Sequence, residues 1–205
     1  MLGGTVRGTT TRLRLPTVDD LPSYQRWSAD MRVRAGGPMG RIGEPAMQAT
    51  WKERLIEWEK EKETVVWSIE TASSPPDGSG LVGMAAVHFS GAPASDTIDV
   101  KRLVVDPDRW RSGYGWDAAL TLHRWIFDIC HLRVADIDLP ADNVAGLRIA
   151  AKLGYERYAL GHAVYYGDGR YVDQQRLRMD LDTWDARWGA TQREYATPLG
   201  EELER

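Results

Sequence analysis

The sequence contains a single cysteine, Cys130, among its 205 residues, so no disulfide can form within one chain. A chain without disulfides fits a reducing compartment, and we expect a cytoplasmic protein. No uninterrupted apolar run approaches the ~20 residues of a membrane-spanning helix. The opening stretch Met1–Thr11 lacks the apolar segment of a secretory signal. The sequence therefore favours a protein with no membrane partner.

An excess of positive charge is also missing, because 26 lysines and arginines face 30 acidic residues and the formal net charge is −4. Such a chain offers no broad basic surface, and no nucleic-acid partner is expected. The 4 histidines are scattered without ligand spacing, so no metal site is expected. Tryptophan is plentiful, with 9 residues against 2 phenylalanines. Core packing explains most of these tryptophans as well as pocket lining does.

One stretch, residues 103–118, combines a strand end, a glycine loop and a helix start. It begins with the apolar run Leu103–Val105, which is typical of a strand, and a following Asp-Pro pair ends that strand. Gly113 and Gly115 then permit close approach of the backbone to a ligand, beside two arginines, Arg109 and Arg111. Amide groups at a helix start bind anions, so this loop is a candidate phosphate or pyrophosphate site. An ordinary turn before a helix is the alternative, and neither a P-loop nor a dinucleotide fingerprint fits.

The remaining periodicities predict a mixed α/β chain with early antiparallel hairpins and a strand–helix–strand crossover. Strands are expected near residues 13–15, 65–70, 81–89, 98–105, 134–139, 155–166 and 172–181. Helices are expected after the start Thr17–Asp20, with Thr17 or Asp19 as the cap, and over residues 47–63, 118–129 and 143–152. A loop rich in Gly, Pro, Met and Arg is expected over residues 31–45. The length suits one domain with a substantial core.

Several motifs occur in one order along the chain and together resemble the GNAT acyltransferase superfamily. They are Leu-x-Val-x-Pro at 103–107, Trp-Arg-Ser-Gly-Tyr-Gly-Trp-Asp-Ala at 110–118, Asn143, and Lys-Leu-Gly-Tyr at 152–155. The nearest branch is the RimJ/RimL type, which acetylates N-terminal amines of ribosomal proteins, and Arg-Leu-Arg-Leu-Pro at 12–16 resembles its opening. The resemblance implies a GNAT-like α+β fold, with a central mixed, mostly antiparallel twisted sheet flanked by helices. It implies one domain over residues 1–184 and a polar tail over 185–205.

The resemblance also implies acetyl-CoA, or another acyl-CoA, as cosubstrate. In this superfamily the strand matching Leu103–Val105 bonds the pantetheine arm, and the loop matching Trp110–Gly115 holds the pyrophosphate. Asn143 matches a position near the pantetheine, with a helix cap as the alternative, while Arg148 and Lys152 match basic positions near the cofactor or are surface charges. The implied cofactor-binding residues are therefore Leu103, Val104, Val105, Trp110, Arg111, Ser112, Gly113, Tyr114, Gly115, Trp116, Asn143, Arg148 and Lys152.

Two departures from the superfamily pattern concern the site. Gly146 replaces the serine that usually follows the asparagine, and Ala150 stands where many members carry a tyrosine general acid. That role is then either empty or filled by Tyr155, Tyr165 or Tyr166. If the chain has no general acid, it is a catalytically silent CoA-binding sensor or scaffold, which is the alternative to an enzyme.

Acyl transfer to an amine requires a base, a site for the oxyanion and a proton for the leaving thiolate. Asp99 matches the superfamily's common glutamate base, and we expect it to act through water because its side chain is shorter. Strict alternation puts Asp99, Leu103 and Val105 on one face, unless a bulge changes the parity. The alternative for Asp99 is an ion pair with Lys101, and His88 is the second candidate base, with a structural role as its alternative.

The expected activity is acetyl transfer to a primary amine of a protein N-terminus or a small molecule. The sequence does not select the acceptor or the acyl chain, and it leaves a homodimer open.

Overall fold

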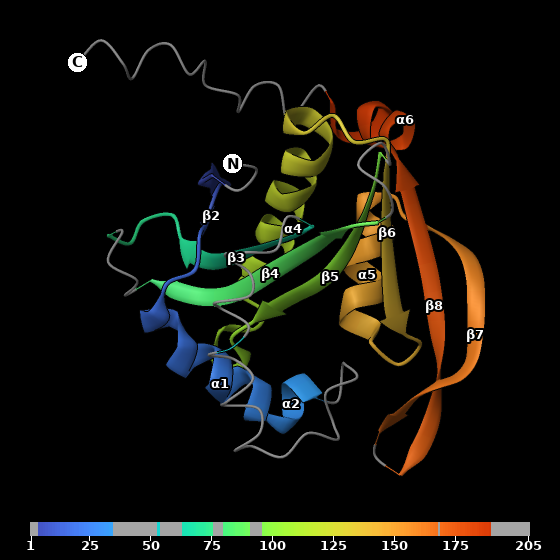
Figure 1. Ribbon diagram of the computed structural model, residues 1–205, viewed down its shortest axis with the longest axis horizontal. Coiled ribbons are helices and arrows are strands. Elements are labelled where there is room, and N and C mark those ends of the chain that lie inside the picture. Colours follow the sequence, from blue (N-terminus) through green and yellow to red (C-terminus); the bar gives the residue numbers. More distant parts are fainter. Residues whose placement is uncertain are drawn as a thin grey trace.

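The computed structural model describes residues 4–34, 53, 63–75, 80–90, 96–167 and 169–189. Eight strands form one twisted sheet in the order β1-β2-β3-β4-β5-β6-β8-β7, and only β5 and β6 run parallel (Figure 1). The strands are β1 (Val6–Arg7), β2 (Thr11–Arg14), β3 (Thr64–Thr71), β4 (Leu81–Phe89), β5 (Thr97–Val105), β6 (Val134–Pro140), β7 (Glu156–Gly167) and β8 (Arg170–Asp180). This mixed, mostly antiparallel sheet confirms the predicted fold class.

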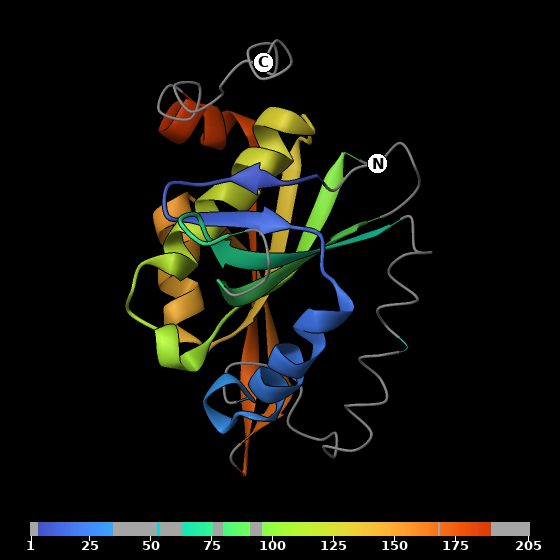
Figure 2. The same cartoon turned by 90° about the vertical axis from the view of Figure 1, so that its left-hand side faces the viewer.

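Helices lie on both faces of the sheet, α4 and α5 on one and α1 on the other (Figure 2). They are α1 (Leu21–Ala29), α2 (Met31–Arg34), α4 (Tyr114–Arg124), α5 (Val144–Leu153) and α6 (Leu181–Trp184), with shorter turns η1 (Val18–Asp20), η2 (Pro107–Arg109), η3 (Trp125–Ile129) and η4 (Asp185–Gly189). None of the helices in the described part of the chain is long and apolar enough to cross a membrane.

The main core lies between the sheet and α4, because the helix carries apolar residues at helical spacing. Ala118, Leu122 and Ile126 are fully buried, and the ring of Trp125 meets Trp67 of β3 edge-on at 4.7 Å. Cys130 follows this helix half-buried, and burial raises its thiol pKa to about 11. The thiol therefore stays protonated, as expected for a packing residue rather than a nucleophile.

A second, smaller core lies beneath α1 on the opposite face. Leu21, Tyr24 and Trp27 of that helix are buried against Met84 and Ala86 of β4. Alternate side chains of β4 and β5 therefore face α4 on one side of the sheet and α1 on the other.

The strands β5 and β6 separate after a short start. Their parallel pairing covers only Thr97–Asp99 with Val134–Asp136, although both strands continue beyond it. Beyond this contact the facing edges have no ladder between them, because β5 stays with β4 and β6 stays with β8. The sheet is therefore split by a V-shaped gap at its centre.

One local prediction differs from the structure, and the first residues of the predicted tail belong to the described part of the chain. Met31–Arg34 forms the short helix α2 rather than the start of a loop, whereas the rest of the predicted loop and most of the predicted helix over 47–63 lie outside the described residues. The segment after Trp184 continues as η4, and Trp188 packs on Trp116 with ring centroids 5.7 Å apart. The first residues of the predicted tail therefore contact the domain.

Candidate active site

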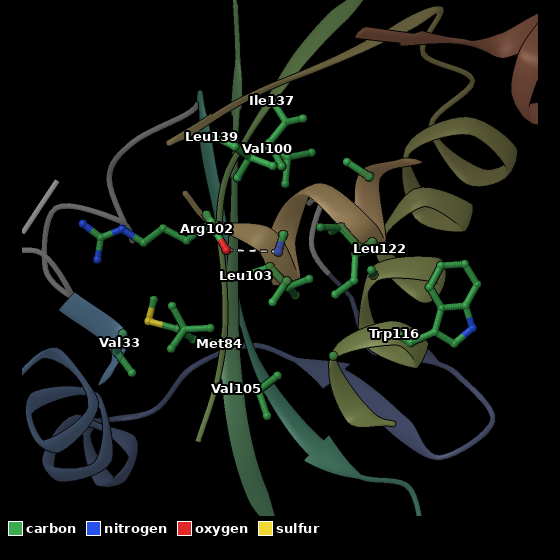
Figure 3. A pocket seen from close by; sticks show the side chains of 18 of the residues that line it. Val33, Met84, Val100, Arg102, Leu103, Val105, Trp116, Leu122, Ile137 and Leu139 are labelled. Carbon is green, nitrogen blue, oxygen red and sulfur yellow. Dashed lines mark hydrogen bonds between the residues drawn. The ribbon is translucent and has the colours of Figure 1, made fainter. Parts of the chain in front are cut away.

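A cavity of about 880 Å³ runs through the gap between β5 and β6. Residues from both helix layers line it, including Leu122 of α4 on one side and Trp27 and Val33 on the other. Figure 3 shows the division: Leu103, Val105 and Trp116 lie on the α4 side of β5, and Arg102, Met84 and Val33 lie on the α2 side. One continuous space thus connects the two faces of the sheet.

Among the described residues, the β5 edge of this gap has backbone groups that no ladder to β6 uses. In an antiparallel ladder every second residue directs both its amide and its carbonyl at the partner strand. The Asp106 amide donates to the Val82 carbonyl at 2.8 Å, so by alternation Val104 also bonds to β4. Leu103 and Val105 therefore turn their backbone groups into the gap. Of the predicted strand residues, Val104 is the one whose backbone faces away.

A side chain already uses one of these groups. The indole nitrogen of Trp110 donates to the carbonyl of Val105 at 2.9 Å, and this bond fixes the loop against the strand end. The Leu103 amide and carbonyl and the Val105 amide are then left facing the cavity. An extended ligand with alternating amide donors and acceptors could pair with them as an added strand does.

A β-bulge in β5 separates the two ends of the strand. Ala86 pairs with Arg102 while its neighbour Val87 pairs with Val100, so Lys101 is the extra residue. The bulge reverses the alternation, and Asp99 and Leu103 consequently face opposite sides of the sheet. Strict alternation, which put Asp99, Leu103 and Val105 on one face, is therefore wrong for this strand. Leu103 faces α4, and Asp99 lines the cavity on the α1 side.

The loop before α4 has the form of an anion site. Arg111 and Gly113 adopt left-handed conformations, with φ of 67° and 84°. Within the described part of the chain, the amides of residues 111–115 make no backbone hydrogen bond, as expected for the first turn of a helix. Arg109 and Arg148 also line the cavity and add positive charge. Free amides, a helix N-terminus and arginines together suit a phosphate group.

Eleven of the predicted cofactor-binding residues line the cavity: Leu103, Val104, Val105, Trp110, Arg111, Gly113, Tyr114, Gly115, Trp116, Asn143 and Arg148. The other two, Ser112 and Lys152, are not among its lining residues. The ammonium of Lys152 instead lies 3.6 Å from the ring centroid of Trp116, a cation–π contact on the outside of α5.

Asn143 begins α5 as its N-cap. Its side-chain oxygen accepts from the amide of Gly146 at 3.0 Å, which is the alternative role weighed from the sequence. Because Asn143 also lines the cavity, the cap holds its amide group at the cavity wall. The glycine at 146 gives this cap room, since a Cβ there would lie 2.8 Å from the Asn143 amide nitrogen.

Both candidate bases lie on the α1 face at the closed end of the gap. His88 and Asp99 are cross-strand partners on β4 and β5, but only Asp99 lines the cavity. The Asp99 carboxylate accepts from the Ser90 hydroxyl and pairs with Lys101, whose ammonium is 2.9 Å away. The His88 ring lies 3.1 Å from the Thr64 hydroxyl. Asp99 is thus the one with access to a ligand, and its predicted alternative role, the pair with Lys101, is present.

The position of the superfamily's tyrosine acid is occupied by Ala150, which is buried and lines the cavity. Two of the predicted substitutes also line it, Tyr155 and Tyr165, whereas Tyr166 meets Tyr171 edge-on with ring centroids 5.1 Å apart. The Tyr165 hydroxyl accepts from the Gln174 amide at 3.2 Å. Burial raises the pKa of Tyr155 well above its usual value.

Two features of the cavity wall were not predicted from the sequence. One is His123, which is buried against Tyr155. The other is Asp136, whose carboxylate forms two 2.7 Å hydrogen bonds with the guanidinium of Arg178 and sits beside Asp99 across the parallel register. The alternation of Ala135, Asp136 and Ile137 along β6 could have placed the Asp136 carboxylate on the polar face of the strand. It could not have identified Arg178 on β8 as its partner.

The α1 layer is tied by ion pairs to the turn η2, which precedes the anion loop. Arg26 of α1 reaches Asp106 at 2.6 Å, and Arg32 of α2 reaches Asp108 at 2.9 Å. These contacts set the helix layer over one side of the cavity. The described residues include no group of three or more His, Cys, Asp or Glu side chains placed to hold a metal ion.

Comparisons with known proteins agree with this geometry. Residues 11–156 match the family model of the acetyltransferase (GNAT) domain. The chain is similar to Mycobacterium smegmatis RimJ, solved in complex with CoA-disulfide, with a TM-score of 0.74, 16% identity and coverage of 93% of this chain and 94% of that one. It is also similar to spermidine N-acetyltransferase from Vibrio cholerae, solved with CoA and spermine, with a TM-score of 0.70, 12% identity and coverage of 86% and 98%. No curated protein sequence matches the chain.

Proposed function

The chain belongs to the GNAT acetyltransferase family, and from this premise we propose that it transfers the acetyl group of acetyl-CoA to a primary amine by direct attack. The observation that carries the proposal is the cavity through the split sheet. It connects an anion site at the N-terminus of α4 with a carboxylate-bearing surface beneath α1. A cosubstrate with phosphates at one end and a thioester at the other fits such a passage.

We assign the ends of the cosubstrate from the groups that each region offers. The free amides of residues 111–115, with Arg109, Arg111 and Arg148, would hold the phosphates. The backbone of Leu103 and the Val105 amide would bond the pantetheine amides along the open edge of β5. The thioester would then lie near the bulge, where the gap closes.

For this reaction the chain must supply a proton acceptor, a hydrogen-bond donor for the oxyanion and a proton donor. Asp99 receives the proton that the attacking amine loses, directly or through a water molecule. A backbone amide on the open edge of β5 stabilises the developing oxyanion. Tyr165 could supply a proton to the leaving thiolate, because its hydroxyl accepts from Gln174 and does not use its own proton in that bond. Tyr155 also lines the cavity, but its hydroxyl donates to His123.

The acceptor is proposed as a primary amine that enters from the α1 side. One similar structure carries a name that points to an amine acceptor, a spermidine N-acetyltransferase, and another is named RimJ, the type that the sequence motifs resemble. A protein N-terminus of the RimJ/RimL kind and a small polyamine are both consistent with this class. We place the reaction in the cytoplasm on the strength of the single cysteine.

A CoA-binding module without turnover is the second candidate, and Ala150 is the observation that favours it. The cavity wall carries a methyl group where many family members have their proton donor. Such a module would use the same anion site and the same open strand edge.

Two measurements separate these proposals. Saturating CoA should raise the melting temperature, because a ligand at a hundredfold excess over its dissociation constant stabilises the native state by ~2.7 kcal/mol. Thiol release from acetyl-CoA is then followed with a panel of peptide N-termini, polyamines, amino sugars and amino acids. Release with any amine supports the enzyme, binding without release favours the module, and no binding removes both.

A further inference from the structure

Lys101 places a primary amine of this chain on the acceptor side of the cavity. It is the extra residue of the β5 bulge, next to Arg102, which pairs with Ala86 of the core beneath α1. The Lys101 side chain follows this face, because its ammonium lies 2.9 Å from the Asp99 carboxylate. Both side chains line the cavity and both are partly exposed, 50% for Lys101 and 26% for Asp99. An amine and a carboxylate are thus in contact where the gap closes.

This pair reproduces what acyl transfer requires of an external acceptor. The acceptor nitrogen must sit beside a proton-accepting group and near the thioester. Lys101 is two residues from Leu103, whose backbone opens into the gap. At ~3.3 Å of rise per residue, their Cα atoms are separated by about 7 Å along the strand. The side chain of Lys101 is therefore long enough to bring its nitrogen to the same part of the gap.

We propose that Lys101 is an internal acyl acceptor, so that the protein acetylates its own Lys101 when acetyl-CoA is bound and no external amine is present. The inference rests on the proposed function. In the step, the neutral Lys101 nitrogen forms a C–N bond with the acyl carbon as the C–S bond breaks. Asp99 takes the proton from the nitrogen, and the sulfur leaves as CoA thiol after gaining a proton. The products are acetyl-Lys101 and CoA, with no other reactant.

Acetylation of Lys101 removes the positive charge that pairs with the Asp99 carboxylate. The Ser90 hydroxyl would remain as the partner of that carboxylate. An external primary ammonium would compete with Lys101 for the same carboxylate, so a good acceptor should slow the modification of Lys101. Lys101 thereby marks the place where an external amine binds.

The chain also provides an internal reference in Lys152. Its ammonium rests on the ring of Trp116 on the outside of α5, and it is not among the cavity-lining residues. Chemical acetylation by free acetyl-CoA should reach this exposed lysine as readily as Lys101. Catalysed acetylation should favour Lys101 alone.

The experiment incubates the full chain with acetyl-CoA and no added amine. Intact-mass spectrometry follows the gain of one acetyl group, and peptide mapping locates it. We expect acetylation of Lys101 to be roughly a hundredfold faster than that of Lys152, the range of a positioned proton acceptor. The rate constant should not depend on protein concentration, because the transfer is intramolecular. Equal rates at the two lysines would overturn the proposal.

Two variants give the matched controls. Lys101→Arg keeps the positive charge beside Asp99 but offers no acylatable amine, and it should gain no acetyl group at this site or a neighbouring one. Asp99→Asn keeps Lys101 and should lose most of the rate advantage over Lys152. If either variant is acetylated as fast as the parent, the inference is wrong.

The melting temperature with CoA separates the two levels of failure. If CoA raises it and Lys101 still stays unmodified, only the self-acetylation is wrong. If CoA does not raise it, the proposed function fails first, and the inference fails with it.

Discussion

The hydroxyl of Tyr155 donates a hydrogen bond to Nε2 of His123 at 2.7 Å inside the main core. The other ring nitrogen of His123, Nδ1, lies 2.7 Å from the carbonyl of Ala119, which can only accept. The proton of the neutral ring is therefore on Nδ1, and Nε2 is left as the acceptor. Burial lowers the pKa of His123 to about 4, so the ring stays neutral in the folded protein at physiological pH.

This pair makes stability depend on pH. The unfolded chain binds a proton at His123 near its ordinary pKa of 6.5, and the folded chain does so only near 4. The stabilisation is complete above pH 6.5 and is lost as the pH falls toward 4, since the unfolded state then binds more protons. At ~1.4 kcal/mol per pKa unit, the loss is about 3 kcal/mol. Urea unfolding across this pH range measures it.

His123→Gln provides the matched control. Its amide oxygen can still accept from Tyr155, but it does not titrate. The variant should be less stable at neutral pH and should show a shallower decline between pH 6.5 and 4. An unchanged decline would mean that other groups, not His123, cause the acid dependence.

A second stability prediction concerns Asp117 at the start of α4. Its buried carboxylate accepts from the amides of Thr9, Thr10 and Thr11 and from the Thr11 hydroxyl, at 2.6–3.1 Å. Asp117→Asn keeps the shape but replaces one acceptor oxygen with a donor, so at least one buried amide loses its partner. We expect a loss of about 2 kcal/mol in the free energy of unfolding.

The exposed Asp182 supplies the comparison for that measurement. Asp182→Asn should change the unfolding free energy by no more than about 0.5 kcal/mol. Equal effects of the two substitutions would show that the Asp117 bonds do not stabilise the β1–β2 turn against α4.

The fold could be predicted because local and global signals agree in its central unit. The run Leu103–Val105, the Asp-Pro break and the helical spacing from Ala118 to Ile126 each specify their element without reference to distant residues. The glycine loop could likewise be placed at a helix N-terminus. Gly113 is its N-cap in the left-handed conformation that favours glycine.

The arrangement of the catalytic side could not be predicted, because it depends on register. A single extra residue at Lys101 moves Asp99 to the face opposite Leu103, and no local preference in the sequence fixes that bulge. The pairs Tyr155–His123 and Asp136–Arg178 join residues 32 and 42 positions apart, which only the sheet and helix packing bring together. Sequence motifs therefore predicted the strand, loop and helix along the cavity better than the side-chain contacts on its α1 side.

The glycines of the loop should differ in their response to substitution. Gly113→Val places a β-branched residue at φ of 84°, where a side chain meets no neighbour but the backbone is strained. The cost of about 1–2 kcal/mol should move the loop and weaken CoA binding. Gly113→Asn is the control, because asparagine tolerates this conformation and should retain more affinity. Calorimetric titration with CoA measures both.

Gly115 lies within α4 and is not among the residues with positive φ, so only space matters there. A Cβ would lie 3.5 Å from Val105 and 3.8 Å from Ile149, which is ordinary contact. Gly115→Ala should therefore fold and bind CoA nearly as the parent does, whereas Gly115→Val should reach into the cavity and reduce the affinity. Parental affinity in both valine variants, at 113 and 115, would reduce the loop to an ordinary turn.

The last prediction separates the two candidate bases on the α1 face. Asp99→Asn keeps the shape and a hydrogen-bonding oxygen but removes the carboxylate that would accept the proton from the amine. Turnover at neutral pH should fall by roughly 10²–10⁴, the range for a positioned acid or base. The deficit should shrink at higher pH, where more of the acceptor is already neutral. CoA affinity should barely change, because Leu103 and Val105 open into the gap on the far side of the bulge.

His88→Asn is the comparison, since His88 is the cross-strand partner of Asp99 but does not line the cavity. A structural His88 predicts a small change in turnover and no change in the shape of the pH profile. If Asp99→Asn keeps near-parental turnover at every pH while His88→Asn removes it, the imidazole is the base. The proton must then move from the amine to the His88 ring through water molecules beside residue 99, because the ring itself does not line the cavity.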